Sequence, residues 1–371
     1  MHLTRLALTD FRGYASADVL LERGVTVFTG ANGQGKTNLV EAACYAATFA
    51  SHRVTSDAPL VRHGADRAII RAKVSSAGRD SLVEIEVNPG KANRVRVNRA
   101  PVPRPRTAIG VLRCVLFAPE DLSIVKGDPD QRRRYLDDLL VAIRPRFAGV
   151  RADYERAVRQ RSALLKSARA RGGGVPRGLD VWDDQLVAAG AQLTAGRLEL
   201  VDAIRPLAAR AYSAVSGAAR DTAMRYRQSF RPEEEPLPER EKLAEAMHRA
   251  LADSRRAELE RAVCLVGPHR DELELSIGGL PTRGYASHGE SWSMALALRL
   301  AAFEVLRADG EDPVLILDDV FAELDAGRRD RLAGLVGAAD QVLVTAAVGA
   351  DVPAELSGRR FTVADGMITD G

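Results

Sequence analysis

The sequence predicts an α/β protein whose main domain is assembled from both ends of the chain and interrupted by a helical insertion. Short β-branched and aromatic runs dominate the first third, and similar runs resume after about residue 258. Between them, residues 129–219 are rich in alanine, leucine and arginine with helical spacing. We therefore expect one domain made of residues 1–125 and 258–371, with residues 126–257 forming a second, mainly helical lobe.

The same patterns place the individual elements. Strands are expected at residues 3–8, 25–29, 68–74, 81–87, 94–97, 111–117, 220–230, 263–266, 273–277, 314–317, 341–345 and 359–363. Helices are expected at residues 38–49, 239–256, 291–306 and 326–336, and within 129–219 on both sides of a Gly-rich break at 171–176. Residues 231–238 are rich in proline and glutamate and are expected to form a linker.

Composition limits the class of protein. The chain has 371 residues, 46% of them hydrophobic, which is enough for a large core and two domains. It has no run of 18 apolar residues and no signal-peptide pattern, so we expect a cytoplasmic protein with no membrane partner. Cys44, Cys114 and Cys264 are far apart in the sequence and form no CxxC pair, which argues against a zinc site or a disulfide framework.

Residues 30–37 read GANGQGKT and match the GxxxxGKT pattern of a phosphate-binding loop. The loop lies between an expected strand and an expected helix, so a bound phosphate would meet the free N–H groups of a helix N-terminus. Lys36 is expected to contact the terminal phosphates, and the Thr37 hydroxyl to bind Mg²⁺. The residues expected to bind ATP here are Gly30, Ala31, Asn32, Gly33, Gln34, Gly35, Lys36, Thr37 and Asn38.

The segment VLILDD at residues 314–319 has the form of the acidic partner of such a loop. A buried strand would present both carboxylates at its C-terminal end, where open α/β sheets bind their ligands. We expect Asp318 to hold Mg²⁺ through water and Asp319 to activate the attacking water, so that both act with Lys36 in ATP hydrolysis. The alternative is that two acidic residues simply end a strand.

Two later segments have a structural and a functional interpretation. Ser287 and Glu290 of the SHGE segment fit a capping box, and Asp325 of AELD fits a helix N-cap. The order of the phosphate loop, S-x-G-E, hydrophobic-DD and A-E-L-D also resembles the ABC-type ATPase superfamily. In that superfamily the S-x-G element contacts the γ-phosphate held by the opposite protomer. The resemblance therefore implies nucleotide contacts for Ser287, Gly289, Glu290 and Asp325.

Further segments narrow the resemblance to one family, and they cover the chain from end to end. They are LTDFRGY (8–14), GANGQGKTNLVEA (30–42), FAPEDL (117–122), GDPDQRRRYLDD (127–138), GPHRDEL (267–273), SHGE (287–290) and LILDDVFAELD (315–325). In this order they look like the RecF recombination mediators. The resemblance implies an ABC-type, SMC-like ATPase head with a short helical lobe in place of a long coiled coil.

The family resemblance also implies a function. A member would be a weak ATPase that binds DNA, dimerises with ATP, and helps RecO and RecR to load RecA during DNA repair, replication restart and SOS induction. By analogy with related heads, Arg12 would reach the nucleotide phosphates. One departure follows the expected strand at residues 341–345, where the wider superfamily often has a switch histidine and this chain has Thr345, Ala346 and Ala347.

DNA binding has independent support from the charge distribution. Residues 126–177 contain fourteen basic and six acidic residues, whereas the whole chain carries a net charge of +3. These basic side chains are expected to form a stripe that contacts the phosphates of duplexes and single/double-strand junctions, with little sequence specificity. The expected DNA contacts are Arg132, Arg133, Arg134, Arg144, Arg146, Arg151 and Arg159. The alternative is a solvated helical face with local ion pairs.

Three other classes fit less well. The ATPase subunit of a membrane transporter would have a much shorter insertion between Lys36 and Ser287. An SMC-like tether would show sustained heptads through the middle of the chain. A small-molecule P-loop kinase would have no use for S-x-G-E followed by LDD and AELD.

Overall fold

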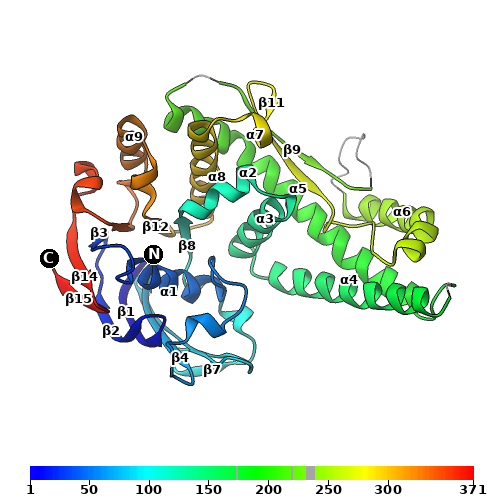
Figure 1. Cartoon of the computed structure of the whole chain (residues 1–371), viewed down its shortest axis with the longest axis horizontal. Coiled ribbons are helices and arrows are strands. Elements are labelled where there is room, and N and C mark those ends of the chain that lie inside the picture. The colour runs from blue at the N-terminus through cyan, green and yellow to red at the C-terminus, as the bar shows by residue number, and fades with distance from the viewer. Residues whose placement is uncertain (173, 219, 231–238) are drawn as a thin grey trace. The chain divides into compact units, whose positions relative to one another are not determined.

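The computed structural model describes residues 1–172, 174–218, 220–230 and 239–371, which form two compact units (Figure 1). The head unit comprises Met1–Leu122, Arg210–Ala219 and Ser287–Gly371, and the helical unit comprises Ser123–Ala209 and Arg220–Ala286. The sequence analysis expected the main domain to resume at residue 258, whereas the last segment of the head unit begins at Ser287.

The centre of the head unit is a six-stranded sheet in the order β15-β14-β3-β13-β12-β8. Its strands are β3 (Gly24–Thr29), β8 (Cys114–Phe117), β12 (Val314–Asp318), β13 (Gln341–Ala346), β14 (Arg359–Ala364) and β15 (Met367–Asp370). All are parallel except β15, which pairs antiparallel with β14. Every residue of β12 and β13 is buried, as expected for parallel strands covered on both faces.

A second, antiparallel sheet has the order β2-β1-β4-β5-β6-β7. Its strands are β1 (His2–Phe11), β2 (Tyr14–Leu20), β4 (Ala68–Ser76), β5 (Arg79–Val87), β6 (Arg94–Val97) and β7 (Ala100–Val102). Helix α1 (Lys36–Thr48) packs against strands of both sheets, and one hydrophobic cluster joins all three elements. This packing fixes the start of α1 at the carboxyl ends of β3, β12 and β13.

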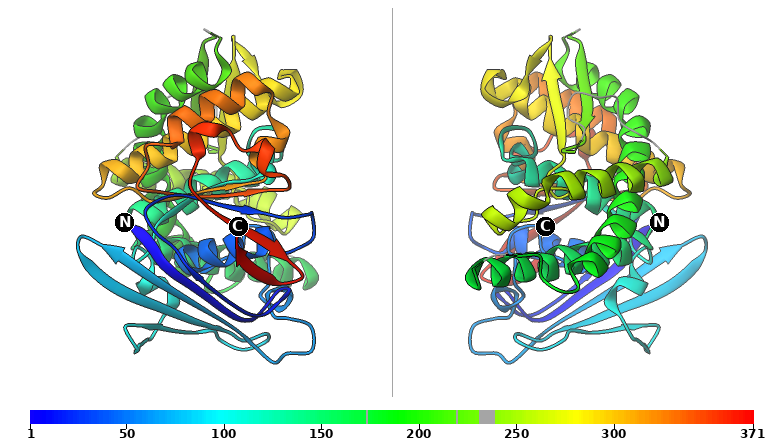
Figure 2. Two further views of the ribbon diagram at one scale, coloured as in Figure 1. Left: turned by 90° about the vertical axis from the view of Figure 1, so that its left-hand side faces the viewer. Right: turned by 90° about the vertical axis from the view of Figure 1, so that its right-hand side faces the viewer.

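Segments from the two ends of the chain lie side by side in the head unit, where the N-terminal strands are blue and the C-terminal strands red (Figure 2). The Gln341 side chain makes one such link, because it accepts a hydrogen bond from the Leu3 N–H and donates one to the Leu3 carbonyl, both at 2.8 Å. Helices α8 (His288–Ala308) and α9 (Ala326–Val336) complete the unit. Short helical turns occupy Ala58–Leu60, Pro105–Ala108, Pro119–Asp121, Val320–Glu323, Gly349–Asp351 and Ala354–Leu356.

The helical unit contains long helices and a small antiparallel sheet in the order β11-β10-β9. Its helices are α3 (Pro129–Ile143), α4 (Phe147–Ala170), α5 (Leu179–Ser216), α6 (Arg240–Arg261) and α7 (Thr282–Tyr285), and α2 (Leu122–Lys126) begins at its boundary. Its strands are β9 (Thr222–Arg227), β10 (Glu272–Ile277) and β11 (Leu280–Pro281). The last turns of α5 belong to the head unit.

Most of the predicted elements are present, but one strand prediction is wrong. Residues 263–266 form no strand, although all four are described. Their backbone groups bond to side chains instead of a β-ladder: the Leu265 N–H donates to Glu258 at 2.7 Å, and the Cys264 carbonyl accepts from Arg270 at 3.0 Å. The sequence also missed β2, β7, β11 and β15, and the linker predicted at residues 231–238 lies outside the described part of the chain.

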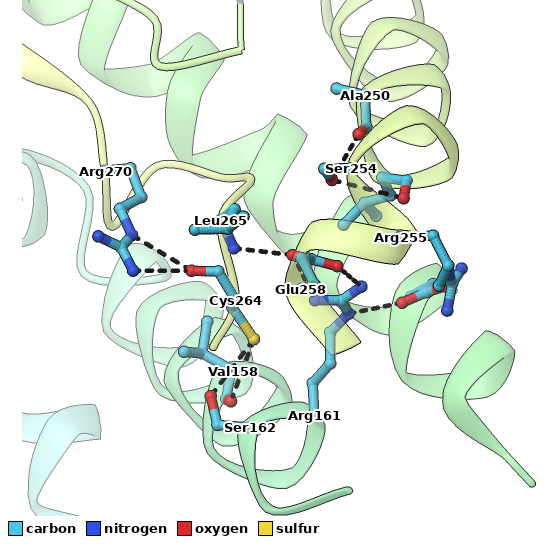
Figure 3. A network of polar contacts seen from close by, with 12 residues as sticks. Val158, Arg161, Ser162, Ala250, Ser254, Arg255, Glu258, Cys264, Leu265 and Arg270 are labelled. Atoms are coloured by element: carbon cyan, nitrogen blue, oxygen red, sulfur yellow. Dashed lines mark hydrogen bonds and ion pairs between the residues drawn. The ribbon is translucent and has the colours of Figure 1, made fainter. Parts of the chain in front are cut away.

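A buried ionic network holds α4, α5 and α6 together (Figure 3). The side chain of Arg161 is 0% exposed and donates to Glu258 at 2.5 and 2.8 Å and to Asp183 at 2.6 Å. Arg255 also pairs with Asp183. Each buried charge therefore has an opposite partner, and removing one partner would leave the others uncompensated.

Arg161→Ala is expected to lower the free energy of unfolding by about 3–5 kcal/mol, because it leaves the buried carboxylates of Glu258 and Asp183 without the positive charge that they share. Arg156→Ala is the matched control on the same helix, since its ion pair with Asp153 is exposed and is expected to contribute less than about 1 kcal/mol. Urea unfolding followed by circular dichroism measures both. Equal effects of the two substitutions would contradict a stabilising role for the network.

Candidate functional site

The loop at residues 30–35 connects the carboxyl end of β3 to the start of α1. Two of its glycines are required by the local geometry. A Cβ atom at Gly30 would lie 2.2 Å from the Val363 carbonyl oxygen, and Gly35 has a φ of 109° and lies against the Tyr14 hydroxyl. The Gln34 side chain accepts a hydrogen bond from the Asp365 N–H at 2.6 Å, which ties the loop to the turn after β14.

Lys36 lies back across this loop. Its ammonium group donates to the carbonyls of Gly30 at 2.9 Å and Ala31 at 3.3 Å, and the residue is 3% exposed. A cation is thus held beside the free N–H groups at the start of α1. This arrangement favours an anion at the mouth of the loop.

Asp318 is the second charged group of the site and ends β12. It is 3% exposed, and its Oδ1 atom accepts hydrogen bonds from the hydroxyls of Thr37 at 3.1 Å and Thr345 at 2.6 Å. Burial, together with the charge of the neighbouring Asp319, raises the pKa of Asp318 to about 6. Three elements, β12, α1 and β13, therefore meet at one carboxylate.

Asp319 follows with a left-handed backbone, at a φ of 50°. Its N–H donates to the Thr345 hydroxyl at 3.0 Å. A non-glycine residue held in this conformation carries strain that the surrounding structure must support, and such residues concentrate at functional sites. Sequence reasoning assigned no role to Thr345, although the parallel register of β12 and β13 places it beside Asp318.

The structural interpretations of the SHGE and AELD segments are confirmed. The Ser287 hydroxyl accepts from the Glu290 N–H at 3.2 Å, and the Glu290 carboxylate accepts from the Ser287 N–H at 2.8 Å. Asp325 caps α9 by accepting from the Arg328 N–H at 3.0 Å. Nucleotide contacts by Ser287, Gly289, Glu290 and Asp325 remain predictions.

The structure places Arg12 on a carboxylate of α1. Its guanidinium donates to both oxygens of Glu41 at 2.6 and 2.9 Å and to the Pro59 carbonyl at 2.9 Å. Burial opposes the Glu41 charge, but hydrogen bonds from Arg12 and Ser51 hold its pKa below the ordinary value. Arg53, which sequence reasoning missed, links Asn38 at 3.0 Å to Glu41 at 3.4 Å. In this structure Arg12 therefore braces α1.

Most of the arginines expected to bind DNA have partners within the helical unit. Arg132 is 5% exposed and donates to Glu272 and to the carbonyls of Ile124 and Gly127, so its predicted place on an accessible stripe is wrong. Its burial depends on Glu272 of β10, which lies 140 residues further along the chain, so no local sequence pattern reveals it. Arg133 donates to the Asp271 carbonyl, Arg134 and Arg151 pair with Asp138, Arg144 pairs with Glu199, Arg159 lies 3.9 Å from Glu155, and Arg146 lies over the Phe147 ring.

The residues that the structure describes contain no group of three or more His, Cys, Asp or Glu side chains placed to hold a metal ion. No helix in the described part of the chain is long and apolar enough to cross a membrane.

A parallel sheet with a phosphate loop after β3 and a buried carboxylate at the end of β12 defines an ABC-type ATPase head. Residues 2–352 match the model of the RecF/RecN/SMC N terminal domain. The chain is 59% identical over 374 residues to the DNA replication and repair protein RecF of Frankia alni, and 57% identical over 373 residues to that of Streptomyces avermitilis. Each match covers 99% of both proteins. The chain therefore belongs to the RecF family of DNA replication and repair proteins.

Solved structures agree with this assignment. The structure of the recombination mediator protein RecF-ATP in the RecFOR pathway superposes with a TM-score of 0.90 at 27% identity, covering 100% of this chain and 97% of that one. An Smc head bound to the C-winged helix domain of ScpA has a TM-score of 0.57 at 16% identity, covering 100% and 96%, and shows a shared fold. The predicted fold class and family are confirmed, and the family is one of ATPases.

Asp318→Asn is expected to change how stability depends on pH. In the folded protein Asp318 keeps its proton up to about pH 6, whereas the unfolded chain loses it near 3.8. The wild type therefore loses roughly 2–3 kcal/mol of unfolding free energy from this group as the pH rises from 4 to 7, and the variant does not. Urea unfolding at both pH values, without nucleotide or divalent cations, measures the difference. Asp330→Asn at an exposed position of α9 is the control. If the difference in unfolding free energy between variant and wild type is the same at both pH values, the pKa of Asp318 is not raised by burial.

Proposed function

We propose that this chain binds ATP and Mg²⁺ in its head unit and dimerises with ATP on DNA, where slow hydrolysis reverses dimerisation. In this role it acts with RecO and RecR to load RecA at gaps during repair, replication restart and SOS induction, in the cytoplasm at the nucleoid. The observation that carries the proposal is the Asp318 carboxylate held between the hydroxyls of Thr37 and Thr345. Family membership and the similarity to RecF-ATP support it.

The site fits a magnesium nucleotide. Mg²⁺ prefers oxygen ligands and is usually held by one or two carboxylates together with substrate phosphates. A divalent cation beside Thr37 and Asp318 would offset the cost of the buried carboxylate, because burial makes the negative charge of Asp318 unfavourable. The N–H groups of residues 30–38 would surround the phosphates, and Lys36 would exchange its loop carbonyls for phosphate oxygens.

Hydrolysis requires a water molecule aligned with the γ-phosphorus, and we assign its activation to Asp319. The carboxylate would accept the proton of the attacking water as the bond to ADP breaks. Thr345 positions this residue through its hydrogen bond to the Asp319 N–H. We assign Arg12 an indirect part, because its contacts with Glu41 brace the helix that begins with Lys36 and Thr37.

Ser287, Gly289, Glu290 and Asp325 are proposed to meet the nucleotide of a second copy of the chain. Ser287 lies at a helix N-terminus and is exposed, so it can approach a phosphate from outside. Two head units would thereby form two composite sites, each with a phosphate loop from one copy and an S-x-G element from the other.

For DNA, we propose phosphate contacts by the exposed arginines of the basic segment at residues 126–177 and exclude Arg132. The side chain of Arg159 is 68% exposed and only loosely paired, and Arg146 is exposed beside Phe147. Arg134 is half-buried and Arg144 is exposed, and both are paired with carboxylates, so they would exchange partners on binding. Such contacts depend on the negative charge of the DNA phosphates and give little sequence specificity.

Lys36→Ala and Ser287→Arg are each expected to abolish ATP-dependent dimerisation, for different reasons. Lys36→Ala removes the cation that faces the phosphates, whereas Ser287→Arg blocks the surface offered to a partner's nucleotide while its own loop still binds ATP. In a mixture of the two variants, one composite site carries both lesions and the other carries neither. Partial recovery of dimerisation and ATP hydrolysis is therefore expected.

Sedimentation with and without ATP, together with phosphate release, measures this recovery. Thermal unfolding of each variant alone is the control for loss of the fold, because a lost cap costs about 1 kcal/mol. Normal dimerisation of Ser287→Arg, with no recovery in the mixture, would defeat the composite site and leave Ser287 as a helix cap.

Arg146→Gln combined with Arg159→Gln is expected to weaken binding to gapped duplex DNA by about three- to tenfold and to reduce the slope of log K against log salt by about one to two. Arg256→Gln, at a side chain that is 92% exposed on α6, is the control outside the basic segment. Fluorescence anisotropy between 50 and 200 mM salt measures both. An unchanged salt slope would place the DNA-binding surface elsewhere.

A further inference from the structure

One arginine of the head unit joins the start of α8 to the start of α9. The Nε atom of Arg328 donates to the Ser293 hydroxyl at 3.0 Å, and its Nη1 atom pairs with the Asp325 carboxylate. The backbone N–H of the same residue donates to Asp325 at 3.0 Å. A single side chain thus connects a residue one turn into α8 with the cap of α9.

The guanidinium also lies directly against the SHGE turn. The Ser293 hydroxyl donates to the Gly289 carbonyl at 2.9 Å, and a Cβ atom at Gly289 would lie only 2.9 Å from Nη2 of Arg328 and 3.1 Å from its Cζ. Gly289 lies in the first turn of α8 without a positive φ, so its backbone does not require glycine. Its small size leaves room for the close approach of the Arg328 guanidinium, which a larger residue would displace.

Arg328 is well placed to act as a rigid connection. Its side chain is 23% exposed, whereas the Asp325 side chain is 53% exposed. The planar guanidinium uses different N–H groups for Ser293 and Asp325, which a lysine ammonium on a flexible stem cannot reproduce with the same geometry. The positions of the two turns relative to each other are therefore set before any partner arrives.

We propose that Arg328 is a positioning residue that fixes the Ser287–Glu290 turn relative to Asp325, so that both are presented as one preformed surface to the nucleotide of a second copy of the chain. This inference rests on the composite site of the proposed function. Preformed surfaces bind more tightly because less ordering is needed on association. The residue itself does not touch the reacting atoms.

The monomer provides the first test, because it needs no dimer. Gly289→Ala is expected to lower the Tm of the wild type by about 2–4 °C by displacing the guanidinium, and by less than about 1 °C in an Arg328→Gln background, where the obstructing group is gone. Equal shifts in the two backgrounds would overturn the contact between Arg328 and Gly289 as the reason for glycine.

The dimer provides the second test. Arg328→Gln is expected to weaken ATP-dependent dimerisation at least tenfold while the affinity of the monomer for ATP stays within twofold of the wild type, and Arg328→Lys should recover part of the loss. Arg331→Gln is the matched control: this arginine is on the same helix, but it donates to the carbonyls of Val215 and Ser216 at the end of α5. It should affect Tm without affecting dimerisation.

The outcomes separate the two proposals. If the wild type dimerises with ATP and Arg328→Gln dimerises equally well, the positioning role is overturned and the composite site still stands. If the wild type binds ATP but forms no dimer, the proposed composite site fails, and the monomer experiment still decides whether Arg328 fixes the turn. A parallel loss of dimerisation in Arg328→Gln and Arg331→Gln would mean that general destabilisation explains the effect.

Discussion

The head unit depends on one buried carboxylate, that of Asp318. It lies where β12 ends, and it is hydrogen-bonded from α1 through Thr37 and from β13 through Thr345. These three elements meet only because β3, β13 and β12 are neighbours in one parallel sheet, with α1 packed over them. Burial makes the charged form of this carboxylate unfavourable, which is the main reason why its pKa is raised to about 6. A site of this kind is stabilised by its ligand, so nucleotide binding and head stability are linked.

The helical unit uses its charges differently. Arg161, Arg132 and Arg197 are buried and paired with carboxylates, so part of the arginine content of this unit belongs to its interior. Buried ion pairs add little net stability, but they penalise any packing that separates the partners. The unit therefore gains a specific arrangement of its helices from buried arginines, and two of these, Arg132 and Arg161, belong to the segment that in the sequence suggests a phosphate-binding stripe. Only the exposed and loosely paired arginines remain for a polyanionic partner.

Local patterns made the phosphate loop predictable, because residues 30–37 are consecutive and their chemistry requires glycines and a lysine at fixed spacing. The caps at Ser287 and Asp325 were predictable for the same reason. Tertiary contacts account for what was missed. Arg12 pairs with Glu41 and Arg132 pairs with Glu272, so neither outcome is encoded by a short window. Residues 263–266 read as a strand by composition, but their backbone groups bond to the side chains of Glu258 and Arg270 just before and after them. Arg328 lies outside the motifs identified in the sequence, and its part is revealed by its contacts with Ser293 and Asp325 and by its close approach to Gly289.

The position of β3 between β13 and β14 has a consequence for the synthesis of the protein. Residues 24–29 leave the ribosome early, but both of their sheet neighbours begin after residue 340. The phosphate loop therefore cannot adopt its final conformation until the strands that flank β3 have been made. The helical unit is different, because all of its residues lie between 123 and 286. Translation should produce a folded helical unit first and complete the head last. A ribosome that stalls in the last tenth of the message would release a chain whose ATPase half is unfinished.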